Sequence, residues 1–287
     1  MMPFSSFLSI LLHQACHTYS LLSSPFLRAN PWRKEPNLSW HDTAIVIDGV
    51  AFNDRASVMT VLSADHGRHR GLVYGIHAPA ERSVWQLGNR LQLEWRGRLA
   101  EQLGVFNGEV LATPARMVFD DSLRLATLTA ACALAATSLP EQLPQPQIFA
   151  GLDSLLGLLA SDYFLLAFVR WEVELLAALG FGLDLSVCAV SGKPEELAFV
   201  SPRTGRAVGL AAAGPYRDRL LPLPAFLIPA AAAAEPDQPA DRAAALAGLR
   251  LSGYFLEHRV YAALHQTLPV ARRVLENRLA NASTVIF

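Results

Sequence analysis

The order of polar and apolar residues predicts β-structure in the first part of the chain, from about residue 40 to residue 113. The clearest strand is residues 89–96, where Leu91, Leu93 and Trp95 alternate with polar neighbours, as in a strand with one buried face. The other expected strands are residues 43–50, 57–62, 71–76 and a segment within 98–110, with turn residues between them. Short strands so close together favour a small closed or partly open barrel, such as an OB-fold, over a sandwich.

Helical spacing replaces this alternation after Pro114. The expected helices are residues 123–138, 147–160, 163–179, 241–265 and 270–279. The helix at 163–179 is apolar nearly all round and stops at Gly180 and Gly182, which are common residues after a helix end. Because a helix without a polar face is usually enclosed, we expect this one at the centre of a helical core.

An irregular insert interrupts the helical part at residues 188–210. Within it, residues 199–208 have the pattern of a hairpin that turns near Thr204-Gly205. Residues 230–240 are rich in alanine and proline and form an expected linker before the last pair of helices.

The expected fold class is α+β. It comprises a small β-barrel at residues 37–114 and a helical domain at residues 115–287. Residues 1–36 have the character of a disordered extension or a misassigned start, because their apolar stretch lacks a basic flank and is interrupted by His13 and His17. The longest weakly polar run of the chain is too short to cross a bilayer.

Composition adds two constraints. The net charge is −1, so any anion-binding site must be a local patch. All of the 24 basic residues except Lys34 and Lys193 are arginine, which suits phosphate and base contacts, although a GC-rich genome gives the same bias. The 3 cysteines are far apart, which argues against a disulfide framework and fits a reducing compartment such as the cytoplasm.

No pattern in the sequence supports an enzyme. Residues 191–193 lack the earlier glycine of a phosphate-binding loop, and two pairs of histidines without further ligands do not make a zinc site. Glu172 and Glu174 are two positions apart on a helix, so we expect a solvated or salt-bridged edge and not a carboxylate pair. Cys188 has the pattern of a buried thiol. We therefore expect no catalytic residue, metal or cofactor.

A cationic cluster in the β region is the remaining candidate site. It comprises Arg55, Arg68, His69, Arg70, Arg82, Arg90, Arg96 and Arg98, interleaved with Phe52, Tyr74, Trp85 and Trp95. Strand parity turns Arg90 and Arg96 away from the apolar face, and residues 68–70 are expected in an outward-reaching turn. Such a barrel face suits single-stranded DNA, since arginines follow the backbone and rings stack on bases. The alternative is an ordinary solvated face over core aromatics, because nearby acids cancel the charge.

Several short segments occur in a specific order and spacing. They are residues 40–46 (WHDTAIV), 62–73 (LSADHGRHRGLV), 91–95 (LQLEW), 170–181 (RWEVELLAALGF), 183–188 (LDLSVC) and 200–206 (VSPRTGR). With the β-then-α layout, they make the chain resemble the RecO family of bacterial DNA repair proteins, and most of all its alphaproteobacterial branch. The resemblance covers residue 40 to about residue 279.

The resemblance implies an N-terminal OB-fold, a C-terminal helical domain and a role without enzyme activity or nucleotide in recombinational repair. It implies binding to single- and double-stranded DNA, strand annealing, contacts with RecR and with the tail of single-stranded DNA-binding protein (SSB), and help in loading RecA. RecF is a further partner in many species. The expected location is the cytoplasm, at the nucleoid.

The SSB tail is acidic and ends in a hydrophobic residue, so its receptor needs an apolar pocket with an arginine at the rim. Arg116, Arg124 and Arg170 lie on or beside the expected helical core and are candidates for this role. The alternative is that each pairs with a local acid such as Asp120 or Glu174.

Two departures from the family pattern matter. Many relatives hold zinc with four cysteines in the insert, whereas here Ser191 stands where the second ligand would follow Cys188, so we expect no zinc and a hydrogen-bonded turn in its place. The basic run after the third strand is reduced to residues 77–82, with one arginine and one glutamate. DNA contact could then be shared with helical-domain arginines, namely Arg203, Arg206, Arg217, Arg219, Arg272 and Arg273.

A competing hypothesis is a protein-interaction scaffold. In it the barrel docks a partner protein and DNA binding is weak or absent. The nearly neutral charge of the β region favours this alternative.

Overall fold

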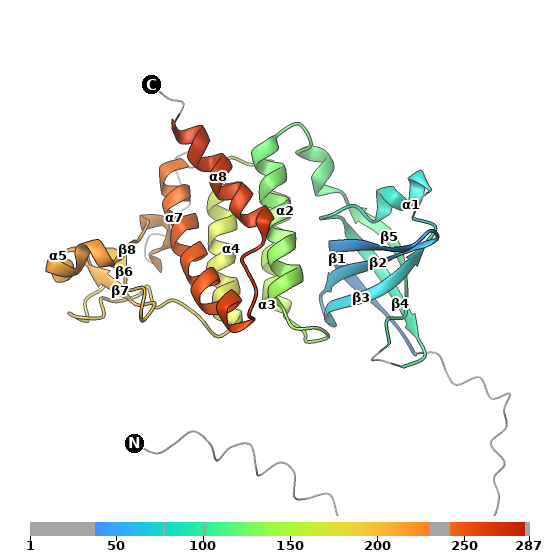
Figure 1. Ribbon diagram of the computed structural model, residues 1–287, viewed down its shortest axis with the longest axis horizontal. Coiled ribbons are helices and arrows are strands. Elements are labelled where there is room, and N and C mark those ends of the chain that lie inside the picture. The colour runs from blue at the N-terminus through green and yellow to red at the C-terminus, as the bar shows by residue number, and fades with distance from the viewer. Residues whose placement is uncertain (1–37, 77, 100–101, 230–241, 285–287) are drawn as a thin grey trace, which may run out of the picture. The chain divides into compact units, whose positions relative to one another are not determined.

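The computed structural model describes residues 38–76, 78–99, 102–229 and 242–284, which belong to one compact unit, Pro36–Phe287 (Figure 1). The expectations for residues 1–36 and for the linker at 230–240 lie outside the described residues.

Five strands close into a barrel. They are β1 (Leu38–Asn53), β2 (Ala56–Ser63), β3 (Gly67–Tyr74), β4 (Arg90–Gly97) and β5 (Val105–Ala112), in the order β1-β2-β3-β5-β4. β1 pairs with both β2 and β4, and parallel pairing of Leu72 with Val105 joins β3 to β5. A short helix, α1 (Pro79–Val84), connects β3 to β4. A small five-stranded barrel of this kind is OB-like, so the predicted fold class is confirmed for this part of the chain.

β3 begins earlier than the sequence pattern suggested. The turn ends at Gly67, whose φ of +67° is readily adopted by glycine, and residues 68–70 then pair with β2. A Cβ atom at Gly67 would lie 2.0 Å from the Leu143 carbonyl oxygen, so the backbone there approaches a later loop closely. The prediction of a turn at residues 68–70 is therefore wrong, because strand pairing continues back to the glycine.

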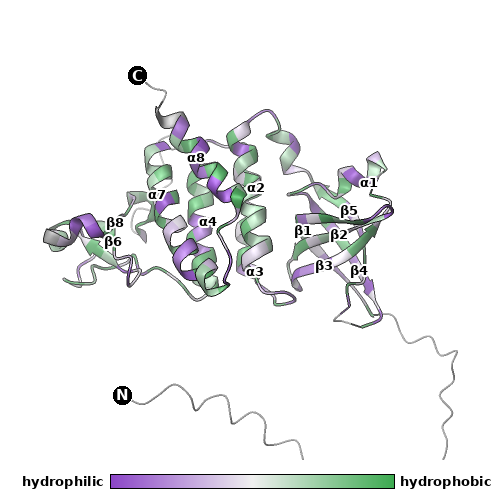
Figure 2. Cartoon of the chain, in the orientation of Figure 1, coloured by the Kyte–Doolittle hydropathy of each residue, from purple (hydrophilic) through white to green (hydrophobic). Residues whose placement is uncertain are grey.

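Alternation along the strands decides which side chains enter the barrel. Leu91, Leu93 and Trp95 of β4 are buried and their charged neighbours are not, as predicted. The strands of the barrel show a mixture of hydrophilic and hydrophobic colours in Figure 2. In β3 the same alternation turns His69 inward and leaves Arg70 exposed. The aromatic side chains inside the barrel thus come from several strands.

The five expected helical segments are present after the barrel. They are α2 (Ser122–Ser138), α3 (Pro146–Leu158), α4 (Phe164–Ala178), α7 (Arg242–Phe255), which continues as a π-helical turn (Leu256–Tyr261), and α8 (Val270–Thr284). Figure 1 shows α4 between α2 and α7, and it also packs against α3. The prediction that α4 is central to the helical core is confirmed.

The barrel and the helices share an apolar core. Ile45 and Ile47 of β1 and Leu62 of β2 are buried in the same cluster as Leu128 of α2. Because these side chains come from the outer face of the sheet, α2 covers one side of the barrel.

A small sheet is formed by the insert and the segment that follows it. Its strands are β6 (Leu197–Val200), β7 (Ala207–Gly209) and β8 (Leu221–Pro222), in the order β7-β6-β8, and a short helix, α5 (Leu210–Ala213), follows β7. The hairpin turns where Gly205 donates its backbone N–H to the Ser201 carbonyl at 2.8 Å, as predicted. Among the described residues, the 3-10 segments are Pro114–Met117, Gly214–Arg219 and Ala225–Leu227.

A buried ion pair joins α4 to α8 and corrects two expectations. Arg272 donates to both carboxylate oxygens of Glu172, and both side chains are 0% exposed. Ser252 of α7 donates to the same carboxylate at 2.6 Å. Glu172 is thus salt-bridged in the core and not at an edge, and Arg272 is enclosed and cannot contact DNA. The position of Glu172 on its own helix does not reveal that a residue of α8, 100 positions later, forms an ion pair with it.

Candidate nucleic-acid interface

Two of the eight predicted DNA-contact residues lie at the end of the barrel that carries α1. Arg55 lies in the β1–β2 turn and Arg82 on α1, and both are exposed. The Gly75 N–H donates to the Arg55 carbonyl at 3.1 Å, which brings the end of β3 beside this turn. Two exposed rings, Phe52 and Tyr74, lie on the same strand ends at 62% and 57% exposure. We call Phe52, Arg55, Tyr74 and Arg82 the α1-end surface.

Two further predicted residues, Arg68 and Arg70, meet at one acid. Arg70 Nε lies 2.8 Å from Glu141 Oε1, and Arg68 Nη1 lies 3.5 Å from the same oxygen. Arg68 Nε also donates to the Leu139 carbonyl at 2.7 Å. These contacts tie β3 to the loop between α2 and α3, so Arg68 has a structural role while Arg70 stays half-exposed.

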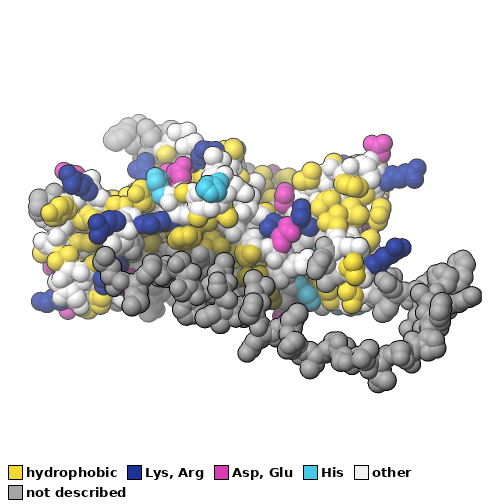
Figure 3. Space-filling view, turned by 60° about the horizontal axis from the view of Figure 1, so that its bottom comes forward, with side chains coloured by type: hydrophobic (Ala, Val, Ile, Leu, Met, Phe, Trp, Pro, Cys, Tyr) yellow, Lys and Arg dark blue, Asp and Glu magenta, His cyan; other side chains and the backbone are white. Residues whose placement is uncertain are grey.

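The arginines of β4 are engaged by nearby carboxylates. Arg90 Nη1 lies 2.7 Å from Asp153 Oδ2 of α3, and Arg96 Nη2 lies 2.7 Å from Glu94 Oε1. Arg98 is exposed just beyond the strand. The structure therefore spreads the predicted cationic residues around the barrel. On the face shown in Figure 3, basic side chains are scattered among hydrophobic and neutral ones.

The predicted aromatic residues divide by burial. Trp85 and Trp95 are core residues, and the Trp85 ring stacks on Phe106 with centroids 6.1 Å apart. His69 is 5% exposed, and burial lowers its pKa to about 4. Of the predicted rings, Phe52 and Tyr74 are thus the ones exposed to solvent.

A cluster that the sequence reasoning did not single out lies at the opposite end of the barrel from α1. Trp40 of β1 stacks on His66 in the β2–β3 turn, and Asp42 accepts hydrogen bonds from Thr43 N at 2.7 Å and Asp65 N at 2.8 Å. Burial alone would raise the pKa of Asp42, but hydrogen bonds from Ser63, Asp65 and His66 hold it below its usual value. The recognisable signal was Trp40 and His66 within two of the quoted family-like segments.

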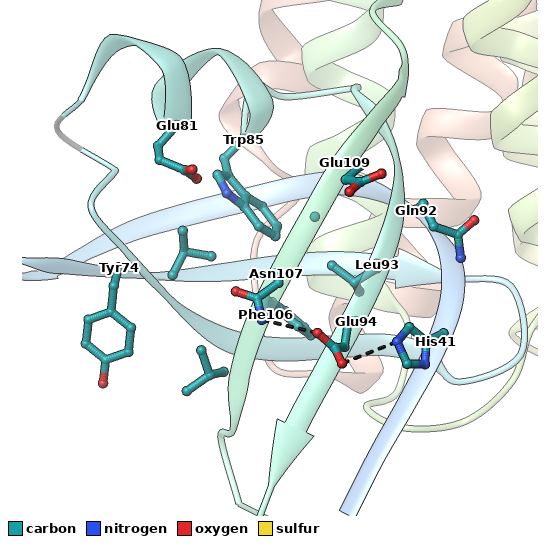
Figure 4. Close-up of a pocket in the computed structure, with 13 residues that line it drawn as sticks. His41, Tyr74, Glu81, Trp85, Gln92, Leu93, Glu94, Phe106, Asn107 and Glu109 are labelled. Atoms are coloured by element: carbon teal, nitrogen blue, oxygen red, sulfur yellow. Dashed lines mark hydrogen bonds and ion pairs between the residues drawn. The ribbon is translucent and has the colours of Figure 1, made fainter.

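The barrel wall carries a hollow of about 460 Å³ between β3, α1, β4 and β5 (Figure 4). Glu81, Glu94 and Glu109 lie around it, together with the Tyr74 and Trp85 rings. Glu94 receives hydrogen bonds from Arg96 and Asn107, which lower its pKa and keep it ionised. A hollow with carboxylates on its rim repels phosphate and suits a basic ligand.

The three candidates for the SSB tail differ in exposure. Arg124 is mostly enclosed: it lies 2.9 Å from Asp121 Oδ2, donates to the Ser161 carbonyl at 2.7 Å, and lies over the Phe164 ring at 4.7 Å. Arg170 is half-buried and donates to a backbone carbonyl at 3.3 Å. Arg116 is exposed in a 3-10 segment, where Met117 is also exposed.

Residues 188–193 form a hydrogen-bonded turn, which the sequence led us to expect there. The Cys188 N–H donates to the Lys193 carbonyl at 2.8 Å, and the Gly192 N–H donates to the Cys188 carbonyl at 2.8 Å. The Cys188 thiol also accepts from the Gly209 N–H at 3.2 Å. In the described part of the chain, no three His, Cys, Asp or Glu side chains are grouped to hold a metal ion. Nor does that part contain a helix of the length and hydropathy needed to span a membrane.

Comparison with known proteins agrees with this architecture. The family model "Recombination protein O N terminal" matches residues 38–114, and "Recombination protein O C terminal" matches residues 120–268. The DNA repair protein RecO of Rhodospirillum rubrum is 46% identical over 248 residues, which is 84% of this chain and 96% of that protein. RecO of Acidiphilium cryptum is 46% identical over 243 residues, with the same coverage, and RecO of Rhodospirillum centenum is 40% identical over 249 residues, or 86% and 97%. The chain therefore belongs to the RecO family of DNA repair proteins.

Proposed function

We propose that the chain is a recombination mediator that binds single- and double-stranded DNA, anneals strands, and helps to load RecA through contacts with RecR and SSB. RecF is a further candidate partner, and the site of action is the cytoplasmic nucleoid. Membership of a DNA repair family and an OB-like barrel support this proposal.

The main support for DNA binding is the composition of the α1-end surface. It offers two exposed arginines and two exposed rings at one end of the barrel. Guanidinium groups bind phosphates and rings stack on bases, which is the chemistry of single-strand binding. Asp54 and Glu81 lie at the same end, so we expect few phosphate contacts and not a strongly basic track.

For the partner contacts, Arg116 is the best placed of the three arginines. It is exposed beside exposed apolar side chains, Met117 and Phe119, at 75% and 60% exposure. An arginine next to apolar surface suits an acidic peptide with a hydrophobic end. Arg124 and Arg170 are engaged by their own surroundings.

A second candidate function, a scaffold that docks a basic protein segment, is favoured by the acid-rimmed hollow. The hollow is negatively charged because Glu81, Glu94 and Glu109 line it, so it is complementary to a basic protein segment and not to DNA phosphates. The hollow and the α1-end surface share the Tyr74 ring, but the hollow is lined by carboxylates and the α1-end surface carries arginines, so the two sites suit ligands of opposite charge.

Charge reversal separates the two functions. A double variant, Arg55→Glu with Arg82→Glu, is expected to weaken binding of the full chain to a labelled single strand by about tenfold or more at low salt. The matched control is Arg250→Glu on α7, an exposed arginine far along the chain from the barrel. Equal affinity of the double variant and the wild type in an anisotropy titration would remove the α1-end surface from the DNA site.

A further inference from the structure

Three aromatic rings stack at the barrel end opposite α1. Trp40 is shared by two parallel pairs: its centroid lies 4.0 Å from His66 at an interplanar angle of 9°, and 5.9 Å from Trp95 at 14°. The backbone register places Trp40 directly across from Trp95 on adjacent strands. The stack is therefore a product of barrel closure and not of neighbouring residues in the sequence.

The stack passes from the core to the surface. Trp95 is 1% exposed, Trp40 is half-buried, and the His66 side chain is 36% exposed. Among the ring pairs of the described residues, His66 contacts only Trp40. The His66 ring thus has one face on Trp40 and another that no described ring covers.

His66 is held in place before any ligand arrives. Its Nδ1 lies 3.3 Å from Asp42 Oδ2, and its backbone N–H donates to Ser63 Oγ at 3.2 Å. Ser63 itself donates to Asp42, so the carboxylate is fixed as well. A ring fixed in this way loses little conformational entropy when a second ring packs on it.

A hollow of about 350 Å³ lies against the stack. It is bounded by the three rings together with His69, Gln142 and Pro144. This volume is near the lower limit of small-molecule sites, which start at roughly 300 Å³. His69 is buried there, and neither of its ring nitrogens has a hydrogen-bond partner among the described residues. The hollow therefore combines ring surface with an unpaired polar group.

We propose that a base of single-stranded DNA stacks on His66 and fills this hollow, extending the ring stack by one member. This inference rests on the proposed DNA-binding function and names a base site within it. Every base has a flat π-face and polar edges, so it can cover the ring and reach polar atoms that an aliphatic side chain would leave unpaired.

Charge around the hollow also favours a base over a phosphate. Arg68 and Arg70 face Glu141, and Asp65 lies on the rim, so the arginines are offset by carboxylates. Stacking needs no net charge and tolerates any base, so this site contributes affinity that depends weakly on salt and on sequence.

The first test compares ring variants of the full chain in binding to a labelled oligo-dT strand at moderate salt. His66→Ala is expected to weaken binding by about fivefold or more, and His66→Phe, which restores a ring, is expected to recover most of the affinity. The matched control is His258→Ala, because His258 also stacks on a ring, Tyr254, at 4.2 Å, but in the π-helical turn that follows α7. Thermal unfolding of each variant checks that the fold is kept.

The second test locates the base directly. A strand with 5-iododeoxyuridine is irradiated with the wild-type chain, and peptide mass spectrometry is expected to find the adduct on His66 or Trp40. Adducts confined to other residues, or unchanged affinity of His66→Ala while the wild type binds DNA, overturn the base site and leave the proposed function standing. Absence of DNA binding by the wild type at low salt overturns both. Unchanged DNA binding with loss of partner-protein binding assigns the hollow to a protein side chain.

Discussion

Burial of His69 inside the barrel makes the stability of the fold depend on pH. Burial lowers the pKa of His69 to about 4 from an ordinary value of 6.5. As pH falls below 6.5, the unfolded chain takes up a proton at this residue and the folded chain does not. The stabilising contribution is therefore present above pH 6.5 and is lost as the pH falls toward 4.

The pH effect is measurable with one variant. His69→Phe keeps an aromatic ring in place and does not titrate. Between pH 7 and pH 5, we expect the wild type to lose about 2 kcal/mol more unfolding free energy than the variant, from the linkage of a pKa near 4 in the folded state. Urea denaturation at both pH values checks this, and parallel losses in the two proteins would contradict it.

The buried pair of Glu172 and Arg272 gives a second prediction at this scale. Glu172→Gln leaves a guanidinium group enclosed without its full partner and is expected to cost about 3 kcal/mol of unfolding free energy. Replacing both residues with leucine is expected to cost less than the single change, because no charge then stays buried alone.

Glu174 on the same helix is the matched control for this pair. Its side chain is exposed, so Glu174→Gln is expected to change the unfolding free energy by less than about 0.5 kcal/mol. Urea denaturation measures all three proteins. A double leucine variant less stable than the single Glu172→Gln variant would show that the pair itself is strongly stabilising.

At the scale of elements, the turn before β3 sets which side chains face the barrel interior. Gly67→Ala is expected to destabilise the chain by about 2 kcal/mol or more, since φ is +67° and the new Cβ meets the Leu143 carbonyl oxygen. Gly157→Ala, in α3 with no atom within 4 Å of the new Cβ, is the control and is expected to stabilise by about 0.5 kcal/mol. Urea denaturation with equal effects of both changes would contradict the role of this glycine.

The periodicity of apolar residues correctly predicted the strands and helices in which this periodicity is unbroken from one end to the other. β4 shows strict alternation from Leu91 to Trp95, and α4 is apolar nearly all round and ends before two glycines, so both were correctly placed. β3 was cut short because Arg68 and Arg70 have the appearance of turn residues, although their pairing partner β2 extends the strand. The pattern of residues within one segment does not show which other strand pairs with it.

The site was less accessible from sequence for a related reason. Trp40 and Trp95 meet only because β1 pairs with β4 when the barrel closes, and Glu172 meets Arg272 across a separation of 100 positions. The sequence shows that Arg90 is basic, but it does not show that this side chain forms an ion pair with Asp153 of α3. The sequence therefore identified candidate residues by their type. Which of them lie close together, and which are exposed to solvent, became visible only in the folded structure.

At the scale of the whole molecule, apolar packing and not surface ion pairs fastens the barrel to α2 and its neighbours. Ile47→Ala is expected to cost about 2–4 kcal/mol, because its side chain is buried at that contact. Arg90→Ala is expected to cost less than about 1 kcal/mol, since the Arg90–Asp153 pair is partly exposed at both ends. Urea denaturation in which Arg90→Ala is the more damaging change would contradict this ranking.

The whole molecule also limits how DNA can be held. Its net charge is −1, and the barrel spreads its arginines among carboxylates, so a long basic track is absent from the described surface of the barrel. Binding must then combine a few phosphate contacts with stacking on exposed rings. This combination predicts moderate salt sensitivity, intermediate between that of a basic groove and that of a neutral surface.

The most direct test of this account is the salt dependence of single-strand binding by the full chain, measured by fluorescence anisotropy with a labelled oligo-dT strand. With two to four arginines in contact, the slope of log K against log salt is expected to lie between about −1.5 and −3, at roughly −0.7 for each phosphate. No binding at low salt, or a slope near zero, would contradict a DNA-binding role for this barrel. Either result would favour the alternative function, docking of a basic protein segment at the acid-rimmed hollow.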